Sequence, residues 1–187
     1  FSEFSQVIGD TLFFAYDNQI TGEELWAHRP SNGSTWQVAD IKSGSGGSYP
    51  GERLSHVIDD VLYFSATDSG HHHIWAHNPS NGSTWKNSDN VQVSCIRQAS
   101  VACRNIVVDD VIYFSGIETF PTSAGVYNNG TELWAYDISN GSSWRLSDMN
   151  NMYSKESGNS DPGKNFMINI GDEIYFDAQG YADTQGN

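Results

Sequence analysis

The chain has 187 residues, with 9 Lys and Arg against 23 Asp and Glu, and a formal net charge of −14. An acidic surface of this kind disfavours nucleic acid or an anionic membrane as a partner. The apolar runs stop at about six residues, far below the roughly 20 that a membrane helix needs. We therefore expect no nucleic-acid partner and no membrane span, and the length allows a sizeable core without a metal or disulfide.

One phrase occurs four times along the chain. An acidic or Gly-Asp pair is followed by four residues that are mostly apolar, β-branched or aromatic, at 9–14, 59–64, 109–114 and 171–176. The pair suits a tight hairpin turn, and the residues after it are strand formers. The copies start 50, 50 and 62 residues apart, which is the spacing of blade or solenoid repeats. The sequence predicts a repeat protein.

The first copy predicts four strands, at 4–8, 11–16, 24–28 and 35–39. Asn32-Gly33 is the hairpin signal between the last two strands, and its positive φ angles are the expected reason for that pair. A Gly- and Ser-rich loop closes the unit. The same order returns twice, and a fourth copy stops after two strands. We place the repeats at 1–52, 53–103, 104–164 and 165–187, the last one partial.

The fold class predicted is all-β, with repeated four-stranded antiparallel blades packed as in a β-propeller. The second strand of each copy is apolar on both faces, as in Leu12-Phe13-Phe14, and a strand of this kind is buried between neighbouring layers. A β-solenoid or sandwich array is the alternative. About three and a half blades do not close a ring, so we expect a part of a longer chain, or self-association through the open blade ends.

Aromatic residues recur at matching positions. The six tryptophans form three pairs ten residues apart, and a phenylalanine ends each repeated phrase. This regularity predicts a structural role for Phe14, Trp26, Trp36, Phe64, Trp75, Trp85, Phe114, Trp134, Trp144 and Phe176.

At Glu24-Leu25-Trp26 and Glu132-Leu133-Trp134 the chain resembles the secreted bacterial and archaeal proteins named for their E-L-W repeats. The likeness extends to the preceding glycines, Gly22 and Gly130, and to the polar turn that follows. The second copy departs from it with His73-Ile74-Trp75. The resemblance implies an extracellular or cell-surface, propeller-like protein, and it supplies no catalytic residues.

Cys95 and Cys103 are the only cysteines, and they lie between the second and third copies. In a secreted protein such a pair predicts a disulfide. The bridge would close a short loop and add about 2.5 kcal/mol in the chain-entropy model. A metal site is the less favoured alternative, because it needs more ligands nearby.

Two groups of residues are metal candidates. Alternate residues of a strand share a face, which would align His71, His73 and His77 for zinc; packing is the competing interpretation. No cofactor is required, but oxygen-rich loops favour calcium. The calcium candidates are Asp17, Glu23, Glu24, Asp68, Glu132, Asp177 and Asp183.

Four asparagines begin an Asn-x-Ser/Thr acceptor for N-glycosylation, and three of them recur at the same turn. They are Asn32, Asn81, Asn129 and Asn140. The third unit also carries an insertion, which we interpret as a loop over 116–131. Loops on a rigid scaffold commonly bind ligands, so Phe120, Pro121 and Tyr127 are the ligand-facing candidates.

No nucleophile elbow, phosphate loop or metalloprotease helix motif occurs. We therefore expect a non-catalytic extracellular repeat protein for adhesion, recognition or surface assembly, with a glycan or protein ligand on its loops. A structural subunit that polymerises into a fibre or sheath is the first alternative. A secreted carbohydrate-active enzyme is the second alternative, because catalytic carboxylates that come from different blades have no fixed spacing in the sequence.

Overall fold

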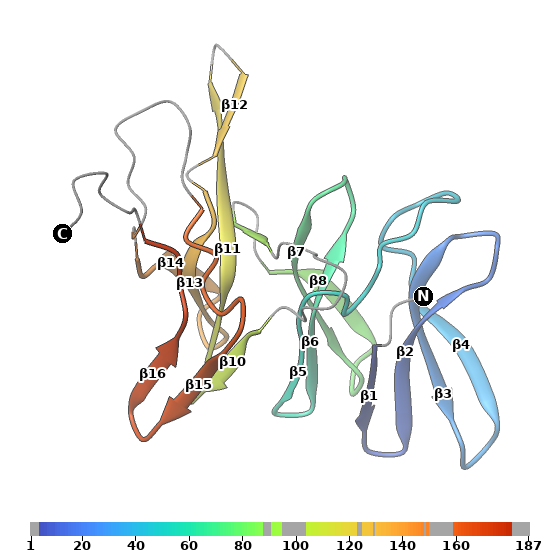
Figure 1. Ribbon diagram of the computed structural model, residues 1–187. Helices are drawn as coiled ribbons and strands as arrows, with labels where there is room; N and C mark the ends of the chain where they lie inside the picture. Colours follow the sequence, from blue (N-terminus) through green and yellow to red (C-terminus); the bar gives the residue numbers. More distant parts are fainter. Residues whose placement is uncertain are drawn as a thin grey trace, which may run out of the picture. The chain divides into compact units, whose positions relative to one another are not determined.

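The computed structural model describes residues 4–87, 91–94, 104–122, 125–128, 130–147, 149 and 159–180, with backbone alone at 119–122 and 125–128. Across these residues every secondary-structure element is a β-strand (Figure 1). No described segment is a helix long and apolar enough to cross a membrane. The chain divides into two compact units, 1–89 and 90–187.

The first unit contains two four-stranded antiparallel sheets, drawn in blue and in green in Figure 1. In each sheet the strands lie side by side in the order in which the chain makes them. The first sheet consists of β1 (Ser5–Ile8), β2 (Thr11–Asp17), β3 (Glu23–Arg29) and β4 (Ser34–Ala39). The second consists of β5 (Ser55–Ile58), β6 (Val61–Thr67), β7 (His72–Asn78) and β8 (Ser83–Lys86).

The repeated phrase forms the hairpin between the first two strands of each sheet. Ile58 pairs with Val61 across the turn, and both turn residues, Asp59 and Asp60, have positive φ angles of 50° and 59°. This is the conformation that matches the right-handed twist of the two strands. The Asn-Gly turns differ from our expectation, because the glycine alone takes a positive φ, 69° at Gly33. The Asn32 side chain instead accepts hydrogen bonds from Ser34.

The two sheets of the first unit pack face to face. We call the side of the first sheet that carries Phe13 and Leu25 its back face, and the side of the second sheet that carries Leu62 and Phe64 its front face. These side chains form one buried cluster, joined by Phe4, Ile8, Ala27 and Ala66. Strand β6 is buried on both faces, since Tyr63 is also buried. The expected double burial of the second strand is thus confirmed for the second sheet, whereas Leu12 and Phe14 on β2 are only partly buried.

The second unit contains the third sheet and a hairpin. The sheet consists of β10 (Ile106–Val108), β11 (Val111–Thr122), β13 (Glu132–Asp137) and β14 (Ser142–Arg145). Strand β11 also pairs with β9 (Val91–Val93) and with β12 (Gly125–Asn128). The hairpin consists of β15 (Met167–Ile170) and β16 (Glu173–Phe176). The fold class is therefore confirmed as all-β, with repeated four-stranded antiparallel sheets of the propeller-blade type.

Two segments pair in ways that the sequence does not indicate. Strand β9, which belongs to the second repeat by sequence, pairs with β11 of the third sheet. The insertion that we had interpreted as a loop over 116–131 continues β11 to Thr122 and returns as β12. Its backbone extends the ladder, with Phe120 opposite Tyr127, so these residues lie on a hairpin and not on an irregular loop.

The paired tryptophans lie on opposite faces of each sheet. Trp26 is opposite Gln37, and Trp36 is opposite Ala27, so the register separates the pair by one position. As a result Trp36 of the first sheet and Trp75 of the second pack against the same inter-sheet cluster. Trp85 and Trp144, from the last strands of the second and third sheets, are exposed.

We predict that Phe64→Ala lowers the free energy of unfolding of the chain by about 3 to 5 kcal/mol, because it leaves a cavity between two packed sheets. Phe64 has no exposed surface. Denaturant titration followed by tryptophan fluorescence measures this change. The control is Val7→Ala on an exposed strand position, which should change the free energy by less than about 0.5 kcal/mol. Equal losses in the two variants would contradict the face-to-face core.

Candidate functional site

The glutamate of Glu-Leu-Trp is the most buried acid in the first unit. Glu24 lies near the start of β3 and has no exposed surface. Its Oε2 accepts hydrogen bonds from the Ile41 N–H at 2.9 Å and the Ser48 hydroxyl at 2.6 Å, and its Oε1 accepts one from the Lys42 N–H at 3.3 Å. The carboxylate therefore holds the loop that leaves the first sheet.

The loop then joins the second sheet through Ser48. The Ser48 N–H donates to the carbonyl of Glu23, and the Ser48 carbonyl accepts from the N–H of Thr67 on β6. A strand of the first sheet and a strand of the second are thus tied through one serine. We call this arrangement of Glu24, Ser48 and Thr67 the junction clasp.

The second unit repeats the clasp with different residues. Glu132 Oε2 accepts hydrogen bonds from the hydroxyls of Ser147 and Ser160, at 3.3 and 2.9 Å, and from the Met149 N–H at 3.2 Å. The Ser160 N–H donates to the carbonyl of Thr131, and its carbonyl accepts from the N–H of Gln179. Ser48 and Ser160, the serines at equivalent places in the two clasps, are fully buried.

A second repeated phrase accompanies the clasp, and our sequence interpretation missed it. Ser48-Tyr49-Pro50-Gly51 and Ser160-Asp161-Pro162-Gly163 have the same pattern, and Tyr49 and Asp161 share a positive φ of 51° and 44°. The phrases are 112 residues apart, the sum of two repeat steps of unequal length. A search for self-similarity at one fixed period therefore passes over them.

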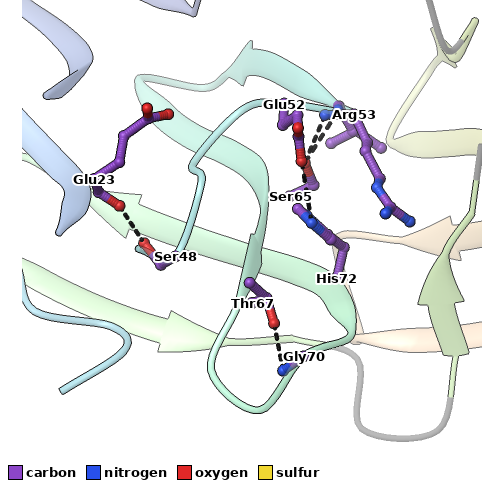
Figure 2. Close-up of polar contacts among 9 residues, drawn as sticks. Glu23, Ser48, Glu52, Arg53, Ser65, Thr67, Gly70 and His72 are labelled. Atoms are coloured by element: carbon purple, nitrogen blue, oxygen red, sulfur yellow. Dashed lines mark hydrogen bonds and ion pairs between the residues drawn. The ribbon is translucent and has the colours of Figure 1, made fainter. Parts of the chain in front are cut away.

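After the Pro-Gly turn, the chain that enters the next sheet is held by the residue directly after the hairpin phrase, which is Ser65 after 59–64 and Asp177 after 171–176. The Ser65 hydroxyl accepts hydrogen bonds from the N–H groups of Arg53 and Leu54, at 2.9 and 3.2 Å (Figure 2). In the second unit the Asp177 carboxylate accepts from the N–H groups of Asn165 and Phe166. Burial opposes the charge of Asp177, but these hydrogen bonds outweigh it and lower its pKa.

A histidine–glutamate contact braces the same connection on the second sheet. His72 Nε2 lies 3.2 Å from Glu52 Oε2, and both side chains are largely buried (Figure 2). Glu52 follows the Pro50-Gly51 turn, whereas His72 begins β7. The pair therefore connects the incoming chain to the third strand of the sheet that the chain is about to form.

The glycine before Glu-Leu-Trp is explained by the same geometry. Gly22 has a φ of 73°, and a Cβ added there would lie 2.6 Å from the Gly47 nitrogen. Only glycine permits both the left-handed backbone and this close approach. Gly130 has the equivalent place and a φ of 76°.

Burial raises the pKa of Glu24, although the hydrogen bonds from Ser48, Ile41 and Lys42 counteract part of that rise. A carboxyl group in this position accepts from fixed N–H and hydroxyl donors, and the loop that they come from covers it. The arrangement suits a structural acceptor.

The structure does not assemble the expected metal ligands. Among the described side chains, no three His, Cys, Asp or Glu groups converge as a metal site would require. Of the calcium candidates, Glu24, Glu132 and Asp177 accept the hydrogen bonds given above, and Asp68 lies 3.2 Å from the Lys86 ammonium. Glu23 is buried on β3, and Asp17 is its cross-strand neighbour. Asp183 lies outside the described residues.

The three histidines proposed as zinc ligands do not share one environment. His71 is exposed before β7 begins, whereas His73 and His77 are buried on the front face of the second sheet. His77 Nδ1 lies 2.9 Å from Thr84 Oγ1, and its ring packs at 5.3 Å from that of Phe13. Burial lowers the pKa of His77, although a hydrogen bond to the Ser83 backbone opposes that shift.

The remaining sequence candidates have simple placements. Asn32, Asn81 and Asn140 are exposed at the turns after β3, β7 and β13, so glycosylation there stays a prediction. Cys95, Cys103 and Asn129 lie outside the described residues, and so do the side chains of Phe120, Pro121 and Tyr127.

No protein-family model matches the sequence, and no curated protein matches it. The solved structure of TolB from Acinetobacter baumannii is similar over 74% of this chain, with 14% identity and a TM-score of 0.43. The matched part is 29% of that protein. A likeness this distant carries no information about ligand or partner.

We predict that Glu24→Ala lowers the free energy of unfolding by about 3 kcal/mol, because three donors lose their acceptor in a covered position. Glu24→Gln should cost less, since its amide oxygen still accepts hydrogen bonds and its neutral form avoids the cost of burying a charge. Denaturant titration compares the two. The control is Glu173→Ala at an exposed acid, and a loss there as large as in Glu24→Ala would contradict the assignment.

We predict a pH dependence that arises at His77. Its folded pKa is below the unfolded value of 6.5, so protonation favours the unfolded chain, and stability is lost as the pH falls below that value. His77→Tyr introduces the residue that the third sheet has at this position, Tyr136, and should reduce the loss of unfolding free energy between about pH 7 and pH 5.5.

The matched control for this measurement is His71→Gln, because His71 is exposed. It should keep the pH dependence of the unaltered chain. An unchanged slope in His77→Tyr would show that the buried imidazole does not contribute.

Proposed function

We propose that the chain is a non-catalytic repeat protein that works outside the cell in adhesion, recognition or surface assembly. The observation that carries this proposal is the use of its buried acids. Glu24 and Glu132 are the acids that burial would best prepare for chemistry, and each one accepts hydrogen bonds from the loop that covers it. Their arrangement supports a scaffold that connects repeats.

The exposed hairpin turns are better suited to binding than to catalysis. The hairpin turns after β3, β7 and β13 present similar polar tips, and the acidic composition keeps such a surface hydrated. The resemblance to E-L-W repeat proteins supports an extracellular location. Polymerisation into a fibre or sheath is the second candidate, and the exposed apolar face of the first sheet favours it.

The test exposes the purified chain to insoluble cellulose, chitin and peptidoglycan, and measures both co-sedimentation and the release of reducing sugar. We expect co-sedimentation with at least one polymer or self-association, without sugar release. Sugar release that a carboxylate-to-amide substitution abolishes would overturn the proposal in favour of a carbohydrate-active enzyme. A chain that binds neither the polymers nor itself would also contradict it.

A further inference from the structure

Two exposed apolar surfaces of this chain correspond to the two sides of an interface that the chain already contains. In the first unit the back face of the first sheet covers the front face of the second. The front face of the first sheet has the same residue positions as the covered one. Leu12 and Phe14 there correspond to Leu62 and Phe64, because each pair has the same register in its hairpin.

Across the described residues, the front face of the first sheet is covered only in part. Leu62 and Phe64 have no exposed surface, whereas Leu12 and Phe14 are only partly buried, and Val7 beside them is 64% exposed. Tyr16 lies further along β2 on the same face, edge-on to Trp26 with ring centroids 5.3 Å apart. The half over β1 and β2 therefore offers the apolar surface that the second sheet has covered.

The hairpin of β15 and β16 shows the complementary back face. The positions that pack Phe4, Gln6, Ile8 and Phe13 against the second sheet are occupied in this hairpin by Phe166, Ile168, Ile170 and Tyr175. All four are apolar or aromatic, and all four are exposed, by 44, 49, 61 and 46%. Phe4, Ile8 and Phe13 are at most 8% exposed.

We propose that the back face of the β15–β16 hairpin docks on the front face of β1 and β2 in a second copy of the chain. The proposal rests on the proposed role in surface assembly and names the partner. The two surfaces differ, so the contact is head-to-tail, and repetition gives a ring or a filament. Apolar burial drives the contact, and added salt strengthens it by screening the repulsion between acidic chains.

The internal interface defines which residues meet. In the first unit the Gln6 side chain donates a hydrogen bond to the Ser55 hydroxyl at 3.1 Å, and Phe13 packs on His77. The equivalent pairs in the proposed joint are Ile168 with Ser5, and Tyr175 with His28. These are contacts between two copies.

The first test is the assembly state of the 187-residue chain, measured by sedimentation velocity over a range of concentrations and salt. We expect the mean mass to rise with concentration and with salt. Val7→Asp and Ile170→Asp should each raise the concentration for half-association by at least about tenfold, because a carboxylate would enter an apolar contact. Ile20→Asp is the matched control, since Ile20 is 75% exposed on a loop.

The second test mixes two variants with one added cysteine each, Ser5→Cys and Ile168→Cys, under oxidising conditions. We expect a mixed disulfide dimer, above the background of the unaltered chain. Asn32→Cys mixed with Ile168→Cys should not form one, because Asn32 lies on a turn outside the front face.

Three results would overturn the joint. One is a chain that stays monomeric at every concentration and salt. Another is association that Val7→Asp and Ile170→Asp leave unchanged while their melting temperatures match the unaltered chain. The third is a Ser5→Cys, Ile168→Cys double variant that cross-links within single chains. Polymer binding without self-association would reject this joint and leave the proposed adhesion role intact.

Discussion

The repeat junction depends on a carboxylate buried at the start of a strand. A charged group in such a place is costly unless fixed donors surround it. Glu24 meets that requirement with two backbone N–H groups and a serine hydroxyl. Satisfying the acid fixes the path of the outgoing loop, and the same serine then presents its carbonyl to Thr67 of the next sheet.

The clasp occurs where the sequence has both the glutamate and the Ser-x-Pro-Gly phrase. It occurs after the first and third sheets, with Ser48 and Ser160 as its serines. The second sheet has His73 at the glutamate position, and no Ser-x-Pro-Gly follows it before the third sheet.

The sequence was informative wherever the signal was local. The acidic pairs predicted hairpins, which Asp59 and Asp60 form with the backbone angles that such turns need. The doubly apolar second strand predicted face-to-face burial, as Phe64 shows. The regular tryptophans predicted structural positions, although register decides that Trp26 and Trp36 point to opposite faces.

The long-range contacts were not predictable in this way. Glu24 was a calcium candidate from its loop position, because a single sequence does not show that donors 17 to 24 residues away converge on its carboxylate. The insertion in the third unit was interpreted as a loop, but cross-strand pairing makes it a hairpin. The open face of the first sheet became visible only beside the covered face of the second.

Hydrogen exchange at the Thr67 amide tests the central claim most directly, because this N–H donates to the Ser48 carbonyl across the junction. In Glu24→Ala we expect the Thr67 amide to exchange at least about tenfold faster than in the unaltered chain, by local opening of the junction. The Leu146 amide, which donates to the Leu133 carbonyl in the second unit, should keep its rate. Unchanged protection at Thr67 would show that the buried carboxylate does not hold the repeats together.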